Sequence, residues 1–171
     1  IRMATAHTLH RSGHPREAEV AMRRCLQQDG TWLDATDFIY AHAELAWNLT
    51  VRGYCREALD LLRAAAERTT PATGAGIDLA IRMAVPLAVL GQPAQAWECL
   101  PDPGTLDSAN STWLSVNLLS HMLFVFLDQG EFGPPAEAIL ARYAKLGRRP
   151  RSAPFYARHF YVLQAYIRVA Q

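Results

Sequence analysis

The stretch RGYCREALDLL, residues 52–62, has the form of a helix end, a tight turn and the start of a second helix. Two similar phrases occur in the same chain, SGHPREAEVAM from Ser12 and LGQPAQAWECL from Leu90. Aligned on their glycines, and continued to Gly130, the phrases recur about every 39 residues, and a regular period of this size predicts a chain of stacked structural units.

The repeated glycine is expected to end a helix in every unit, because glycine adopts the left-handed conformation that follows a last helical turn without steric cost. Small or apolar residues recur around it. Seven residues before the glycine stand Ala6, Ala46, Ala84 and Leu123, and four before it stand Leu9, Leu49, Leu87 and Phe126. After it stand Ala18, Ala58, Ala96 and, following one extra residue, Ala136. These positions predict two closely packed antiparallel helices in each unit.

The expected fold class is all-α, because no strand-like alternation of useful length occurs. We expect a right-handed α-solenoid of antiparallel helix pairs with a period of about 39 residues. The single domain would hold units at approximately 1–30, 34–70, 75–104, 110–147 and a partial unit at 153–171. Pro101 and Pro103 should shorten one second helix, and Pro86 should kink or break the helix in which it lies.

The composition is that of an ordinary globular protein. Half of the 171 residues are apolar, 19% are charged and the formal net charge is +1, so no strong field would attract nucleic acid or a membrane surface. Three cysteines without metal-ligand spacing indicate free thiols in a cytoplasmic protein. The arginine- and alanine-rich composition favours an actinobacterial source. Because the chain opens at Ile1 and both ends have a helical pattern, we expect a fragment of a longer protein.

The pattern resembles tetratricopeptide repeats over essentially the whole chain. The matching residues are Ala46, Gly53, Tyr54, Ala58 and Ala65 in the best unit, Ala6, Gly13, Ala18 and Cys25 in the first, and Ala84, Gly91 and Ala96 in the third. The period is longer than the period that is usual in that family. The usual proline at the unit end is replaced by Gly30, or comes late at Pro71.

Long, loose repeats of this kind look like the helical-repeat region of large bacterial LuxR-type and actinobacterial pathway-specific transcription regulators. The resemblance implies a non-enzymatic interaction or sensor module that binds a protein, peptide or small-molecule effector. The alternative is a stand-alone scaffold that binds peptides or proteins. We expect no catalysis, no cofactor, no membrane association and no direct contact with nucleic acid. The basic loop GRRPRS, residues 147–152, could touch an acidic partner but is better interpreted as a solvated loop.

The candidate binding residues lie on the helix that precedes each glycine, because these helices line the concave face of such a stack. They are Tyr40, Trp47, His7, His10, Asn117, Phe124 and Asp128. Tyr40 and Trp47 are two helical turns apart and would form an aromatic patch, or would only pack between helices. His7 and His10 have helical metal-ligand spacing but no evident third ligand, so we expect no metal site.

The last helix should present apolar surface, with Phe160, Tyr161 and Tyr166 exposed. We expect that end to be covered by a further helix or by another copy of the chain in a homodimer.

Overall fold

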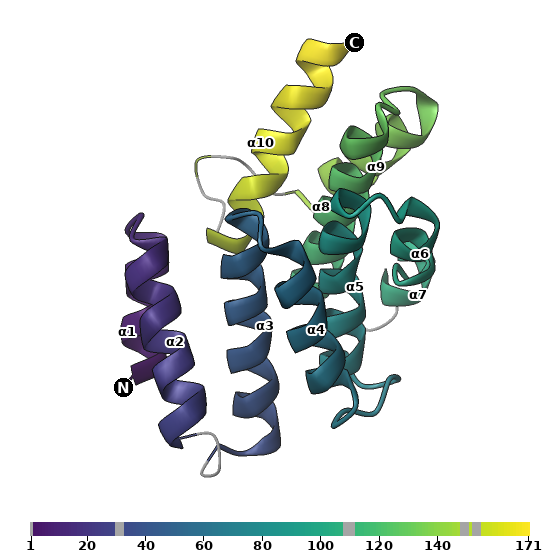
Figure 1. The fold of residues 1–171 in the computed structure, drawn as a ribbon. Helices are drawn as coiled ribbons and strands as arrows, with labels where there is room; N and C mark the ends of the chain where they lie inside the picture. The colour runs from purple at the N-terminus through teal and green to yellow at the C-terminus, as the bar shows by residue number, and fades with distance from the viewer. Residues whose placement is uncertain (1, 30–32, 108–111, 148–150, 152–154) are drawn as a thin grey trace. The chain divides into compact units, whose positions relative to one another are not determined.

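The computed structural model describes residues 2–29, 33–107, 112–147, 151 and 155–171. Within these ranges the regular secondary structure is helical and contains no strand, which confirms the predicted all-α class. The helices, shown in Figure 1, are α1 (Arg2–Arg11), α2 (Pro15–Asp29), α3 (Ala35–Val51), α4 (Cys55–Ala66), α5 (Gly74–Val89), α6 (Pro93–Glu98), α7 (Pro103–Asp107), α8 (Thr112–Gln129), α9 (Pro134–Lys145) and α10 (Phe155–Ala170).

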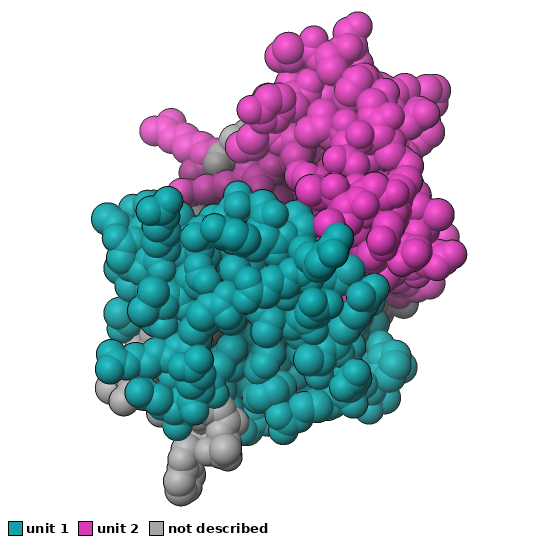
Figure 2. Space-filling view, viewed as in Figure 1, with its two compact units in different colours: residues 1–82 teal, residues 83–171 magenta. Residues whose placement is uncertain are grey.

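The chain divides into two compact units, residues 1–82 and residues 83–171 (Figure 2). The boundary falls within α5. The organisation into five repeat units of one domain stays a prediction.

In the first unit α1 packs on α2, α2 on α3 and α3 on α4. Helix α4 shows why. Its buried side chains, Cys55, Ala58, Leu59, Leu62 and Ala65, recur at spacings of three and four residues. They form one apolar stripe along the helix, and such a stripe must be covered by a neighbouring helix.

In the second unit α8 is the central helix, and α6, α7, α9 and α10 all pack against it. Its sequence is apolar on almost every side, as expected for a helix with neighbours all round. Phe160 of α10 is only 1% exposed and stacks on Tyr143 of α9, with 3.5 Å between ring centroids. The prediction that Phe160 is exposed was therefore wrong, because its side of α10 faces α9, whereas Tyr166 is 61% exposed as predicted.

The glycine prediction is confirmed at all four positions. Gly13, Gly53, Gly91 and Gly130 have φ of 83°, 85°, 75° and 71°. The following residue donates its N–H to the carbonyl five residues earlier, at 2.9 Å in each case. The four bonds run from His14 to Leu9, Tyr54 to Leu49, Gln92 to Leu87 and Glu131 to Phe126. This is the Schellman arrangement of a helix end. We call the helix before each glycine (α1, α3, α5, α8) a first helix and the one after it (α2, α4, α6, α9) a second helix.

The repeated small positions are fully buried. All of Ala6, Ala46, Ala84 and Leu123 on the first helices, and Ala18, Ala58, Ala96 and Ala136 on the second helices, have 0% exposed surface. At seven of these eight positions the side chain is the methyl group of alanine, which lets two helices approach closely. The repeat pattern therefore predicted which positions of the chain are buried.

The prolines in and after α5 and α6 have different effects on the helices. The link after α6 contains a short helix, α7, because proline is tolerated in a first turn and the Asp102 carboxylate accepts a 2.6 Å hydrogen bond from the Gly104 N–H. Pro86 lies inside α5 and does not break it, since the helix continues to Val89, and the alternative that Pro86 kinks the helix stays a prediction. The shortening of α6 by Pro101 and Pro103 is confirmed, since that helix ends at Glu98.

The left-handed glycines can be tested by substitution. Gly53→Ala should lower the free energy of unfolding by about 1 kcal/mol, because an L residue is strained at positive φ even where its Cβ meets no atom within 4 Å. Denaturant unfolding measures the change. The control is Arg56→Ala, at an exposed position of α4, which should change stability by no more than about 0.5 kcal/mol. Equal losses of unfolding free energy in the two variants would show that the positive φ of Gly53 imposes no strain on an L residue.

Candidate functional site

Two positions of the repeat carry polar side chains on successive first helices. On α3, Tyr40 and Glu44 stand at two fixed sequence distances before Gly53. Asp78 and Arg82 on α5 stand at the same two distances before Gly91. Asn117 and His121 on α8 stand at the same two distances before Gly130. We call the position of Tyr40, Asp78 and Asn117 the far position, and that of Glu44, Arg82 and His121 the near position. Because the two positions are four residues apart, both lie on one face of each helix.

In the first unit these positions form an ionic network that we call the Arg82 cluster, made of Tyr40, Glu44, Asp78 and Arg82. The Arg82 guanidinium donates through Nε to Asp78 at 2.8 Å and through Nη2 to Glu44 at 3.1 Å. It also donates through Nη1 to the Ala43 carbonyl at 3.4 Å. The side chains of the three charged residues are between 8% and 12% exposed. Arg82 therefore joins α3 and α5 through nearly buried, charge-assisted hydrogen bonds.

The electrostatics of the Arg82 cluster keep the arginine charged and the tyrosine neutral. Burial opposes the charge on Arg82, but Asp78 and Glu44 outweigh it and raise the pKa of the guanidinium. Burial, with a smaller contribution from the Glu44 carboxylate, raises the pKa of Tyr40 to about 12. The phenol of Tyr40 is therefore protonated at neutral pH and can donate a hydrogen bond or accept one.

Tyr40 gives the Arg82 cluster an accessible aromatic ring, since this residue is 41% exposed. Trp47, two turns further along α3, is half-buried. Four charged side chains act electrostatically on the pKa of the Tyr40 phenol, namely Glu44, Arg82, Asp78 and Arg11 of α1. An exposed ring beside fixed donors and acceptors suits recognition of a ligand by stacking and hydrogen bonding.

The other predicted residues of the first unit lie on α1. His10 is partly buried, and its Nδ1 accepts a 2.9 Å hydrogen bond from the amide of Asn48 on α3. The side chain of His7 lies outside the described residues. The described structure therefore joins His10 to α3 and leaves the prediction for His7 untested.

The remaining predicted residues belong to the second unit. Asn117 is 4% exposed, and its backbone carbonyl accepts a 2.7 Å hydrogen bond from Nδ1 of His121. The His121 ring meets the His159 ring of α10 edge to face, with 6.4 Å between centroids. Phe124 is half-buried and Asp128 is exposed. Asn117 therefore offers little surface to a ligand, and Phe124 and Asp128 offer more.

Sequence reasoning missed Glu44, Asp78 and Arg82, although a signal was present. Tyr40 and Asn117 were chosen at the far position, but the residue at that position on α5 is Asp78. At the near position, three successive first helices carry Glu44, Arg82 and His121 within largely apolar patterns. Recurrence of polar residues at one repeat position would have located the Arg82 cluster.

Among the described residues, no group of three His, Cys, Asp or Glu side chains is placed to hold a metal ion. Within the same part of the chain, every helix is too short or too polar to cross a membrane.

No family model, no curated protein and no solved structure matches this chain.

The Arg82 cluster can be tested by removing its cation. Arg82→Met should lower the free energy of unfolding by about 3 kcal/mol, because two nearly buried carboxylates lose their partner. Denaturant unfolding monitored by circular dichroism gives the value. Arg63→Met, at an exposed position of α4, is the matched control and should change stability by no more than about 0.5 kcal/mol. A loss at Arg82 no larger than that of the control would contradict the network.

Proposed function

We propose that this chain is a non-enzymatic interaction and sensor module that binds a protein, peptide or small-molecule effector on its first helices. Its fold would be a right-handed, tetratricopeptide-like solenoid of helix pairs that keeps the repeat period of the sequence. Four left-handed glycines with the same hydrogen bonds, and eight fully buried residues at the repeat positions, support this fold. Repeats of this kind present an extended, preformed surface for binding.

The observation that carries the proposal is the Arg82 cluster beside the exposed ring of Tyr40. Buried charges are costly and add little stability compared with apolar residues of the same size. In the cluster two successive first helices place polar groups at equivalent repeat positions next to an accessible aromatic side chain. This arrangement is typical of a recognition surface, in which polar groups fix the orientation of a ligand.

A ligand held at Tyr40 would act on the link between α3 and α5. Glu44 lies one turn from Tyr40 on α3 and is bonded to Arg82 on α5. A ligand that binds one arrangement of these side chains better than another shifts the population toward it. Because each repeat unit touches only its neighbours, a small change in the angle between units is passed along the chain.

The setting that we propose is the repeat region of a bacterial transcription regulator, of the LuxR type or of an actinobacterial pathway-specific type, in the cytoplasm. Binding of DNA would then belong to another part of the regulator. This setting rests on the resemblance of the repeats. Sequencing the gene on both sides of the region tests it, because a regulator has an ATPase motif upstream or a helix-turn-helix downstream. Neither motif in the complete gene would contradict the setting.

The binding surface can be tested with a random dodecapeptide library displayed on phage and selected on the purified chain. Selected peptides should bind the unmodified chain. They should bind Tyr40→Ala and Trp47→Ala at least tenfold more weakly by fluorescence anisotropy, because these rings provide contact area. Tyr54→Ala is the matched control, since Tyr54 is an exposed tyrosine outside the proposed surface. No selected peptides, or equal affinities for Tyr40→Ala and Tyr54→Ala, would contradict the proposal.

A further inference from the structure

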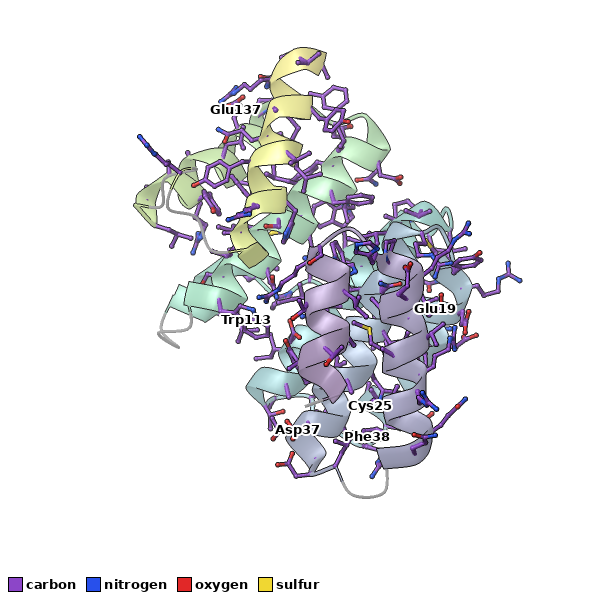
Figure 3. All side chains as sticks on the ribbon, turned by 90° about the vertical axis from the view of Figure 1, so that its left-hand side faces the viewer. Glu19, Cys25, Asp37, Phe38, Trp113 and Glu137 are labelled. Atoms are coloured by element: carbon purple, nitrogen blue, oxygen red, sulfur yellow. The ribbon has the colours of Figure 1, made fainter. Side chains whose placement is uncertain are left out.

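Three side chains form a stack where α3 begins and α4 ends, and we call them the Phe38 stack. The guanidinium carbon of Arg68, just after α4, lies over the Phe38 ring at 3.9 Å from its centroid. The rings of Phe38 and His42, both on α3, are 4.0 Å apart between centroids and tilted by 38°. Figure 3 labels Phe38. The Phe38 stack therefore brings an arginine and a histidine to one aromatic ring.

The half-buried ring of His42 is held in place by its own helix. Its Nδ1 donates a 2.8 Å hydrogen bond to the Phe38 carbonyl, one turn earlier. A carbonyl oxygen only accepts, so Nδ1 carries a hydrogen and Nε2 holds the lone pair of the neutral ring. Protonation of His42 therefore takes place at Nε2. The bond from Nδ1 is kept, and a charged donor strengthens it.

Arg68 is held less firmly than His42. The residue is exposed, and among the described residues no carboxylate forms an ion pair with it. Its contact is with the face of the Phe38 ring. A cation–π contact at an exposed position is weak. Arg68 is therefore the member of the Phe38 stack that can move away at small cost.

The charged groups around His42 come from the start of α3 and from the ends of α2 and α4. Helices α1 and α5 bond to α3 through Asn48 and Glu44, which helical periodicity places on other sides of α3 than His42. Arg68 is the charged side chain that acts on the pKa of His42. The charged residues at this end are Asp29 of α2, Asp34 and Asp37 at the start of α3, and Arg63, Glu67 and Arg68 at the end of α4.

Burial is the main reason that the pKa of His42 lies below its ordinary value of 6.5. The bond to the Phe38 carbonyl acts in the opposite direction, and the positive charge of Arg68 lowers the pKa further. His42 is therefore uncharged at neutral pH. As the pH falls through the lowered pKa, a second positive charge arises beside Arg68. Because the folded chain binds this proton more weakly than the unfolded chain does, acid also lowers the free energy of unfolding.

We propose that the Phe38 stack is a proton-operated latch, in which a proton on Nε2 of His42 drives the Arg68 guanidinium off the Phe38 ring. The bond to the Phe38 carbonyl keeps the imidazolium in place, so the exposed arginine moves into water. One face of the Phe38 ring is thus covered at neutral pH and accessible in acid. The latch lies on another side of α3 than Tyr40, and the proposal is independent of the ligand surface there.

NMR spectroscopy of the complete chain between about pH 8 and about pH 5 tests the latch, since this range spans the ordinary pKa of histidine. At high pH the ring current of Phe38 should shift the Hδ resonances of Arg68 upfield. The shift should disappear with the same midpoint as the titration of His42, and it should persist in acid in His42→Gln. Arg68→Gln should raise the pKa of His42, because a like charge is removed.

The control is a second arginine in the same chain. The Arg52 guanidinium lies 5.0 Å from the centroid of the Tyr54 ring and is bonded to Glu19. Among the described side chains no histidine ring stacks on Tyr54. The Hδ resonances of Arg52 should therefore keep their positions over the same pH range.

Loss of the Arg68 shift at the His42 midpoint, with a higher pKa of His42 in Arg68→Gln, supports the latch. An Arg68 shift that is absent at high pH, or that stays constant in acid, overturns it. So does a shift that is still lost in His42→Gln, or a pKa of His42 that Arg68→Gln leaves unchanged. Circular dichroism follows the helices in parallel. Loss of the helical signal at the His42 midpoint would show that the proton unfolds the chain instead of moving Arg68, and would also overturn the proposal.

Discussion

A glycine in the left-handed conformation closes each first helix, and the packing of the second helix depends on it. At Gly53, φ of 85° turns the chain within one residue, and the following N–H satisfies a carbonyl of the last turn. The second helix can then begin at once and run back along the first. Only this reversal brings Ala58 of α4 close to α3, where both helices bury alanines completely. A β-carbon at the glycine would strain the reversal on which the helix contact rests.

The same register places functional groups. Once the glycine fixes where each first helix ends, the far and near positions occupy equivalent places on neighbouring helices. In the first unit the result is a tyrosine and three charged side chains, with Arg82 bonded to both Glu44 and Asp78. In the second unit the result is a contact between His121 and His159. Charged groups so nearly buried are held in place by their partners, and this fixed geometry is what ligand recognition requires.

Much of this arrangement could be predicted from the chain because the repeat is a local signal. Glycine at a helix end and alanine at a tight contact each have one dominant physical reason, so the four joints and the buried positions were predicted correctly. The burial of Phe160 could not be predicted, because it depends on the stacking of α10 against Tyr143 of another helix. The short α7 was missed because its start depends on capping by Asp102, and proline in a link is more often a sign of irregular structure.

The site was predicted less completely for the same physical reason. Tyr40 was identified from its position on α3. Two other residues of the Arg82 cluster, Asp78 and Arg82 itself, lie one repeat further along the chain. The sequence shows which residues are charged but not which of them form ion pairs. Ion pairing between repeats depends on how successive first helices pack, and the sequence period predicts that packing only in outline.

Arg82 couples α3 to α5 through its bonds to Asp78 and Glu44. A double-mutant cycle with Arg82→Met and Glu44→Gln measures that coupling directly, from the unfolding free energies of the two single variants, the double variant and the unmodified chain. The coupling energy should be about 1.5 kcal/mol, because each single variant removes one side of a nearly buried ion pair. A coupling energy of about zero would show that the two side chains act independently and that Arg82 does not couple α3 to α5.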